Sequence, residues 1–428
     1  MQPGSAARAL YGRTARWPGS ALLASLVSAG FGQTAVFVSG VAAARILGPT
    51  DRGTLATVAL ALSIVVSVGS LGLPLALTYD LAREPDRARS LTRWALRVFF
   101  AQTLLLAPLA ALGIMLLARR DDILATILLG AAVTPAVLGQ MYGLAILQGR
   151  QQFALLNIAR VVPSVLYAAL ASVLLVAGNG SLADVTATYL VANAVGTTVT
   201  LIPALRTTGL AHKVEGRRLV GFGLRAWLGS MSPMDTFRFD QIVVVVLFAP
   251  AIVGTYVVAL AFSNLPRLVG VSIGLVAYPR IAAMRSRDLR RSIFKYTLVT
   301  LIVAAPLVLM IVAAARPIID LFFGDRFASS ADLVGMLVVA GWLAGGRRTM
   351  SEAARGAGLA TAGSLAEVAA WIGFAVAVVL LVPAMHERGV ALAMVIGSGV
   401  GLAAMTGLVV RSHDFEPARR DLVQLEVP

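Results

Sequence analysis

The chain has 428 residues, of which 58% are hydrophobic and only 13% are charged, and it carries a formal net charge of +15. Because about a quarter of the residues of a soluble domain are charged, this composition excludes an ordinary soluble protein. The chain has no cysteine, which excludes disulfides, thiolate metal sites and cysteine nucleophiles. The three histidines, His212, His386 and His413, fall in predicted loops or in the tail, so we expect neither a metal site nor a cofactor.

Apolar runs long enough to cross a hydrocarbon core of about 30 Å recur along the whole chain. They predict an all-α polytopic membrane protein with about twelve transmembrane helices. The first run follows a basic segment but is much longer than a signal-peptide core of about 7–15 residues, so we expect an uncleaved first helix. The expected spans lie near residues 20–46, 54–78, 93–118, 123–147, 155–178, 184–205, 222–248, 252–281, 294–315, 332–352, 358–383 and 389–410.

Basic residues gather in alternate connections, as is typical of cytoplasmic loops. They precede span one and follow spans two, four, six, eight and ten, with the longest series at residues 280–295. The intervening loops are short or balanced in charge. This asymmetry predicts that both termini are cytoplasmic, as tails over residues 1–19 and 411–428. The excess of basic residues in cytoplasmic loops also accounts for the net charge of +15, so we expect no nucleic-acid partner.

The two halves of the chain resemble each other. Pro49 and Gly53 after span one recur as Pro250 and Gly254 after span seven. Six spans per half give parallel repeats, which place a substrate site between two lobes near the bilayer midplane. We therefore expect two pseudo-symmetric six-helix lobes joined by a basic cytoplasmic linker: an N-lobe over 20–205, a linker over 206–221 and a C-lobe over 222–410.

Four charged residues lie where spans seven and eight should be deepest in the membrane: Asp235, Arg238, Asp240 and Arg267. A charge at the bilayer centre costs roughly 2.5–3.5 kcal/mol, so these side chains should face protein or water. Two interpretations of span seven remain open. Asp235 and Arg238 share a helix face and can form an ion pair that locks helix packing. Alternatively, Arg238 is available to a substrate diphosphate, and Asp240 tunes or couples its binding.

Arg267 follows Asn264 and Pro266 near the middle of span eight, too deep for its side chain to reach an interface easily. Proline removes a backbone donor and kinks a helix, which exposes carbonyls that a cavity or a neighbour must satisfy. A planar guanidinium suits diphosphate oxygens in a bidentate manner. We therefore expect Arg267 and Asn264 to line a substrate cavity.

Three further charges lie in or beside the last predicted spans. Arg347 and Arg348 are in the cytoplasmic third of span ten. They are either ordinary anchors of the positive-inside kind or part of a cytoplasmic mouth that attracts an anionic headgroup. Glu367 is a solitary acid in span eleven. It either pairs with an arginine of span ten or serves as a protonation site for coupling.

Two stretches carry a family resemblance: ARILGPTDRGTLATVALALSIVVSVGSLGLP at residues 44–74 and RFDQIVVVVLFAPAIVGTYVVALAFSNLPRLVGVSIGLVAYPRIA at residues 238–282. The first resembles the first hairpin of bacterial polysaccharide flippases, the oligosaccharide-lipid branch of the multidrug/oligosaccharidyl-lipid/polysaccharide exporter superfamily. The second resembles that family's seventh and eighth helices. The resemblance implies a two-lobed, twelve-helix exporter of a polyprenyl-diphosphate-linked glycan, with Asp240 as the helix-seven acid and Arg267 as a cavity base.

The chain departs from two other branches of that superfamily. Lipid II flippases carry two extra C-terminal helices, which have no counterpart here. Multidrug members often place acids in the first lobe for ion coupling, whereas span one here has Gln33 as its main polar residue and no acid.

We therefore expect a non-enzymatic transporter of the bacterial cytoplasmic membrane that flips a lipid-linked anionic oligosaccharide by alternating access. Expected partners are this glycan lipid, membrane lipids, a polysaccharide polymerase and glycosyltransferases. The expected substrate-binding residues are Arg238, Arg267, Asn264, Arg347 and Arg348, with Asp235, Asp240 and Glu367 in coupling or ion pairing.

Two alternatives stay open. A cation-coupled multidrug exporter of the same superfamily would need a cavity of net negative charge. A membrane-embedded glycosyltransferase or ligase, or a scaffold of a polysaccharide assembly complex, belongs to a different class. The longest loop on the predicted outer side, at residues 316–331, offers only Asp320 and Asp325 for catalysis.

Overall fold

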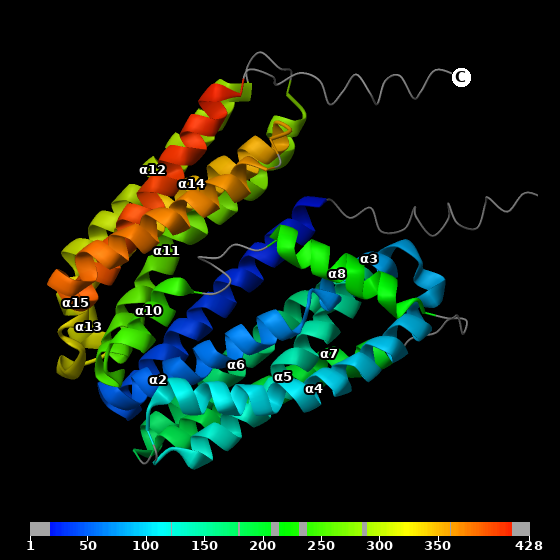
Figure 1. Cartoon of the computed structure of the whole chain (residues 1–428), viewed down its shortest axis with the longest axis horizontal. Helices are drawn as coiled ribbons and strands as arrows, with labels where there is room; N and C mark the ends of the chain where they lie inside the picture. Colours follow the sequence, from blue (N-terminus) through cyan, green and yellow to red (C-terminus); the bar gives the residue numbers. More distant parts are fainter. Residues whose placement is uncertain are drawn as a thin grey trace, which may run out of the picture. The chain divides into compact units, whose positions relative to one another are not determined.

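The computed structural model describes residues 18–120, 122–178, 180–206, 214–230, 238–284, 289–359 and 361–412. Every regular element in these ranges is a helix (Figure 1). Eight of the described helices are long and apolar enough to cross a membrane. The predicted fold class is confirmed: the chain is an all-α, multi-pass membrane protein, in which each helix satisfies its own backbone groups within lipid.

The helices follow the predicted spans closely along most of the chain. Those up to residue 230 are α2 (Pro18–Gly69), α3 (Leu73–Arg83), the 3-10 turn η1 (Pro85–Arg87), α4 (Ala88–Ala118), α5 (Leu124–Gly149), α6 (Phe153–Ala177), α7 (Leu182–Leu205) and α8 (Gly216–Ser230). Those after it are α10 (Phe239–Leu247), α11 (Pro250–Ala282), α12 (Leu289–Ala313), α13 (Ala315–Phe322), the 3-10 turn η3 (Asp325–Phe327), α14 (Ser330–Gly356) and α15 (Ala362–Arg411).

Two of these helices each contain two predicted spans. The backbone of α2 turns at Gly48, with φ 67°, and that of α15 turns at His386, with φ 51°. A positive φ leaves the right-handed helical region, so each long helix is two segments joined at a bend. Glycine adopts this conformation without steric cost, whereas a positive φ is uncommon for histidine.

Span seven differs from the prediction of one helix over residues 222–248. Helix α8 ends at Ser230, and α10 begins at Phe239, after Arg238 in the left-handed conformation with φ 48°. Helix α8 is amphipathic, with Arg217, Arg218 and Arg225 among apolar residues, unlike the continuous apolar run of α10. Arg238 therefore precedes a helix instead of lying within one.

Span two also ends earlier than predicted, at Gly69 instead of residue 78. Gly72 has φ 67°, and a Cβ on it would lie 2.2 Å from the carbonyl oxygen of Gly223 in α8. The chain resumes as α3 after this turn. Close packing of α8 against the Gly72 backbone thus coincides with the break, and only glycine fits there.

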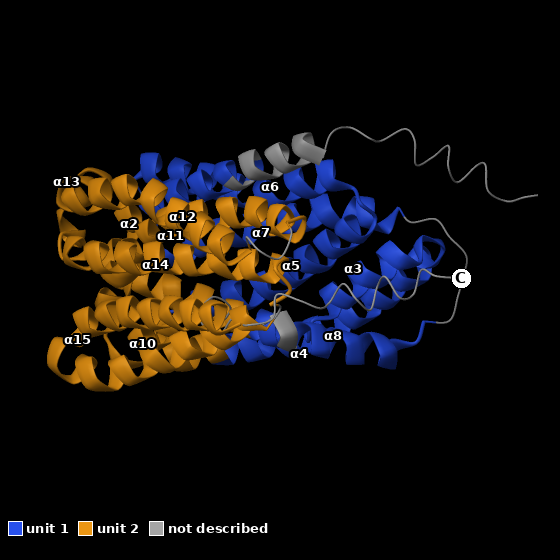
Figure 2. Cartoon of the chain, turned by 90° about the horizontal axis from the view of Figure 1, so that it is seen from above, with its two compact units in different colours: residues 1–42, 65–112, 123–229 blue, residues 43–64, 113–122, 230–428 orange. Residues whose placement is uncertain are grey.

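The chain forms two compact units (Figure 2). Unit 1 comprises residues 1–42, 65–112 and 123–229, and unit 2 comprises residues 43–64, 113–122 and 230–428. Compactness therefore groups two segments of the first half, 43–64 and 113–122, with the second half. The lobe and linker boundaries expected from the sequence stay a prediction.

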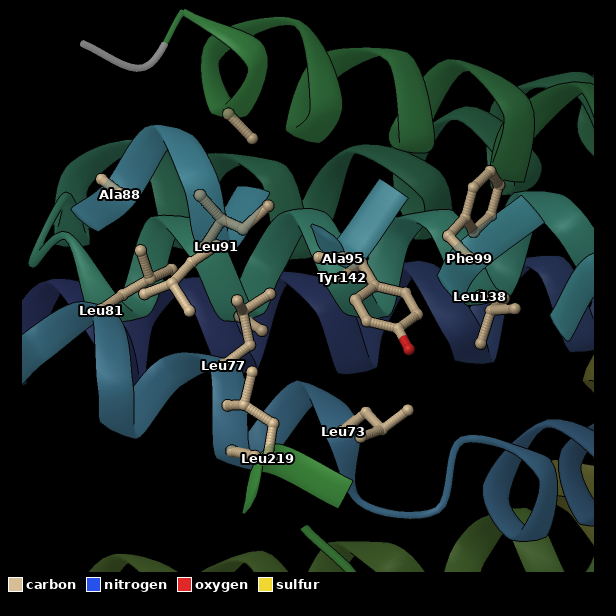
Figure 3. Close-up of a cluster of buried hydrophobic side chains, with 14 of the residues drawn as sticks. Leu73, Leu77, Leu81, Ala88, Leu91, Ala95, Phe99, Leu138, Tyr142 and Leu219 are labelled. Atoms are coloured by element: carbon tan, nitrogen blue, oxygen red, sulfur yellow. The ribbon is translucent and has the colours of Figure 1, made fainter. Parts of the chain in front are cut away.

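Unit 1 has a buried apolar cluster built from α2, α3, α4, α5, α7 and α8 (Figure 3). Leu77 and Tyr142 are almost completely buried in it. The Tyr142 hydroxyl donates a hydrogen bond to Gln102 Oε1 at 2.7 Å, and Gln102 Nε2 donates to the carbonyl oxygen of Gly69 at 2.9 Å. This chain of hydrogen bonds satisfies a free carbonyl at the end of α2.

In unit 2, α11 and α14 approach each other through glycines. A Cβ on Gly341 would lie 2.1 Å from the Ser263 carbonyl oxygen, and one on Gly270 would lie 2.3 Å from the Gly345 carbonyl oxygen. Small residues allow backbones to come this close in membrane proteins. The two helices therefore hold a fixed spacing, which positions the polar residues described below.

A charged cluster fixes the loop between α4 and α5, within unit 2. Arg120 forms ion pairs with Asp51 and, at 2.7 Å, with Asp122. The hydrogen bonds that Arg120 donates to Asp122 and then to Asp51 raise the pKa of Arg120 above its ordinary value, and accepting the hydrogen bond from Arg120 lowers the pKa of Asp122. Arg119 also donates to the carbonyl oxygen of Val246 at 2.8 Å.

This cluster predicts a pH effect on stability. Because the pKa of Asp122 is lower in the folded chain than in the unfolded chain, its contribution is present above the unfolded value of about 4 and is lost as the pH falls through the folded value. We expect the melting temperature in detergent to fall more steeply below about pH 4 for the wild type than for Asp122→Asn. Equal pH profiles would contradict a stabilising role of this pair.

Candidate anion-binding cavity

Unit 2 contains a polar cavity of about 190 Å³. It lies between α10, α11, α14 and α15, and its polar lining residues are Arg238, Asp240, Gln241, Ser263, Asn264, Arg267, Arg347 and Ser398. The other lining residues are Leu, Ala, Gly and Met. Pockets for drug-sized ligands usually measure about 300–1,000 Å³, so this cavity suits a small polar group or a few waters.

The first wall of the cavity is formed by the start of α10. Asp240 is buried, with 4% exposure, and accepts a hydrogen bond from the Tyr256 hydroxyl of α11 at 3.1 Å. Arg238 is exposed, and its charge acts on Asp240. Phe239 stacks on Trp371 of α15, with ring centroids 5.4 Å apart. Contacts on both sides of α10 thus fix this charged turn at the cavity.

The second wall is formed by the middle of α11. Ser263, Asn264 and Arg267 line the cavity and follow one another at helical spacing. Pro266 lies inside α11, which continues as one helix past it. Gly341 of α14 packs on the carbonyl of Ser263 beside this proline. The neighbouring helix thus covers the turn that the proline loosens, as expected where proline interrupts a membrane helix.

The third wall carries a buried ion pair. Arg347 of α14 is 9% exposed and pairs with Glu367 of α15, which is 4% exposed. This pair is one of the two alternatives that the sequence left open for Glu367. The charges of both residues act on Arg267, and the charge of Arg348 acts on it more weakly. Two arginines and one carboxylate from three helices therefore interact at one place.

The remaining residues expected at the site are placed elsewhere or lie outside the described residues. Arg348 is exposed, is not among the lining residues, and pairs with Glu352 at 3.0 Å. Asp235 lies outside the described residues. In the part of the chain that the structure describes, no group of three or more His, Asp or Glu side chains is arranged to hold a metal ion.

Sequence reasoning missed three polar residues of this site: Gln241, Ser263 and Ser398. Ser263 could have been found from its spacing to Arg267, since residues four apart share a helix face. Gln241 follows the buried Asp240 directly. Ser398 has no local signal, because only the packing of α15 brings it to the cavity.

The lining residues include three arginines and one aspartate. Glu367 does not line the cavity but pairs with Arg347, so we include it in the count. The three positive charges of Arg238, Arg267 and Arg347 and the two negative charges of Asp240 and Glu367 give a net charge of +1. In a confined site of low dielectric, such an excess favours an anion strongly.

The fold is shared with solved membrane transporters. The chain is similar to a structure of the lipid II flippase MurJ in an inward closed conformation, with a TM-score of 0.73 and 15% sequence identity over 90% of this chain and 87% of that chain. It is also similar to an inward-facing multidrug resistance MATE family transporter of the MOP superfamily, with a TM-score of 0.70 and 14% identity over 91% of this chain and 100% of that chain. The chain thus has the same fold as these transporters.

The family follows from the sequence itself. Residues 42–332, well over half of the chain, match the family of polysaccharide biosynthesis proteins, and the chain belongs to this family. No curated protein sequence matches the chain. The matched region includes α10 and α11, and so two of the walls of the cavity.

Proposed function

We propose that the chain flips a polyprenyl-diphosphate-linked oligosaccharide from the inner to the outer leaflet of the bacterial cytoplasmic membrane, for the synthesis of a cell-surface polysaccharide. The observation that carries the proposal is the cavity lined by Arg238, Arg267 and Arg347 against the single carboxylate of Asp240. Membership of a polysaccharide biosynthesis family supports the substrate class.

The size of the cavity defines which part of the substrate it receives. A volume of about 190 Å³ is too small for an oligosaccharide. It fits the diphosphate, whose oxygens two guanidinium groups can bind as bidentate forks. The polyprenyl tail stays in lipid, and the glycan lies outside this cavity. Alternating access of the two lobes then carries the headgroup across the membrane.

The charge of the cavity argues against the multidrug alternative. An exporter of organic cations needs an excess of carboxylates, whereas the lining here has an excess of arginines. The enzyme alternative depends on Asp320 and Asp325 as catalytic acids. Asp320 lies on the short helix α13, and Asp325 lies in η3. Purified protein that changed the mass of the glycan lipid in detergent would favour that alternative.

Arg267→Gln and Arg238→Gln test the proposal. In proteoliposomes that contain a polyprenyl-diphosphate oligosaccharide, we expect each variant to slow flipping at least about tenfold, because a hydrogen bond between a charged group and phosphate contributes roughly 1.5–3 kcal/mol. Flipping is measured as the fraction of glycan that an added lectin can reach with time. Arg348→Gln is the matched control, since Arg348 pairs with Glu352 and is not among the lining residues. Wild-type rates in both cavity variants, at normal protein levels, would refute the proposal.

A further inference from the structure

One arginine of the cavity, Arg347, already pairs with a carboxylate of the protein, that of Glu367. Arg347 lines the cavity, while its partner Glu367 does not. Ala370, one helical turn after Glu367, does line it. The carboxylate thus contacts Arg347 from α15, and the cavity is lined by the same arginine.

Separating this ion pair would leave each residue as a buried charge without a counterion. Both residues are more than nine-tenths buried. Burying a charge is costly, and in an ion pair each charge offsets the desolvation of the other. Arg347 can therefore part from Glu367 only if another anion replaces it. A diphosphate in the cavity is such an anion.

Arg347 also has one N–H group that makes no hydrogen bond within the described part of the chain. Its Nε is buried and donates to no acceptor among the described residues. A buried donor without a partner is unfavourable, so an incoming phosphate oxygen gains an additional hydrogen bond there. The aliphatic part of Arg347 packs against Gly401, where a Cβ would lie 2.9 Å from Arg347 Cδ. The backbone of α15 thus directs the guanidinium.

Glu367 does not lose all positive neighbours when Arg347 turns to the substrate. Its charge also acts on Arg267, the lining arginine of α11. The two arginines and Glu367 form a group in which one carboxylate and one diphosphate compete for two guanidinium groups.

We infer that Glu367 is a built-in counterion of the anion site, which holds Arg347 while the site is empty and competes with the substrate diphosphate for it. This inference rests on the proposed function and adds a role in release. By reclaiming Arg347, Glu367 weakens the bound state and speeds the departure of the headgroup after it has crossed.

Pyrophosphate binding tests this inference. With the purified full-length protein in detergent, titration calorimetry with inorganic pyrophosphate gives the affinity of the anion site. We expect Glu367→Gln to bind pyrophosphate at least about tenfold more tightly than the wild type, because close charge pairs couple by 1.5 kcal/mol or more. Gln is nearly isosteric and still accepts a hydrogen bond from Arg347 but carries no charge.

Two further variants make the result decisive. Glu352→Gln removes a carboxylate that pairs with Arg348 and Arg355 and is not among the lining residues, and it should leave the affinity unchanged. Glu367→Asp keeps the charge but draws it back from Arg347, so its affinity should lie between those of the wild type and Glu367→Gln. If Glu367→Gln fails to fold, Glu367→Asp decides the question.

The outcomes separate this inference from the proposed function. If Arg267→Gln and Arg238→Gln lose pyrophosphate binding while neither Glu367 variant binds more tightly than the wild type, the counterion role is wrong and the anion site stands. If the arginine variants bind pyrophosphate as the wild type does, or if the wild type does not bind it, the proposed function is overturned as well.

Discussion

Gly53→Ala and Gly254→Ala are each expected to lower the free energy of unfolding by about 3 kcal/mol or more. Both glycines belong to unit 2, where they meet face to face. A Cβ on Gly53 would lie 1.7 Å from the carbonyl oxygen of Pro250, and one on Gly254 would lie 2.0 Å from the carbonyl oxygen of Pro49. Because these obstacles are backbone atoms near the starts of two helical segments, no side-chain rotation can relieve the overlap.

Gly40→Ala is the matched control for this prediction. Gly40 also lies in α2, but a Cβ there would meet nothing within 4 Å. Alanine at such a helical position should stabilise the chain by up to about 1 kcal/mol. Thermal melting in detergent measures all three variants. Similar melting temperatures for Gly53→Ala and Gly40→Ala would show that the segments do not pack this closely.

The second large effect concerns the buried pair of Arg347 and Glu367. Glu367→Leu should cost about 3 kcal/mol, because it leaves the buried guanidinium of Arg347 without its carboxylate. Adding Arg347→Met should recover most of this loss, since a buried ion pair can be replaced by apolar residues with little net change. Together with Arg347→Met alone and the wild type, these two variants give the four unfolding free energies of a double-mutant cycle, which isolates the coupling of the two residues.

Arg348→Met, Glu352→Leu and the double variant form the corresponding cycle for a partly exposed pair. It should show a coupling of at most about 1 kcal/mol, because water screens exposed charges. A coupling between Arg347 and Glu367 no larger than this would mean that the pair is hydrated and would also weaken the case for competition at Arg347.

The repeated Pro-Gly motif shows how sequence and structure complement each other. The sequence relates Pro49 and Gly53 to Pro250 and Gly254 as equivalent positions of two repeats. In the structure the two copies contact each other. Sequence similarity can reveal equivalence but not contact, because contact depends on how the helices are placed in space.

Span seven shows a local feature that hydropathy did not reveal. The run from residue 222 to 248 is apolar enough to suggest one helix, yet Arg238 is left-handed and α10 begins only at Phe239. Hydropathy measures how readily a segment leaves water, and it does not report the backbone angle of one residue. The hydrogen bond between Tyr256 and Asp240 and the stack of Phe239 on Trp371 secure the turn; Tyr256 belongs to the next helix, α11, and Trp371 to α15, far away in the sequence.

The amino-acid sequence by itself determined that the chain crosses the membrane many times as helices, roughly where most helices begin and end, and which charges lie deep in apolar runs. These properties are local, because each depends on the transfer free energy of about twenty consecutive residues. Only the tertiary structure decided that Arg238, Arg267 and Arg347 line one cavity, that Glu367 pairs with Arg347, and that Arg348 pairs with Glu352 instead. Arg347 and Arg348 are adjacent in sequence, but successive residues of a helix point about 100° apart, so packing against α11 and α15 gives them different surroundings.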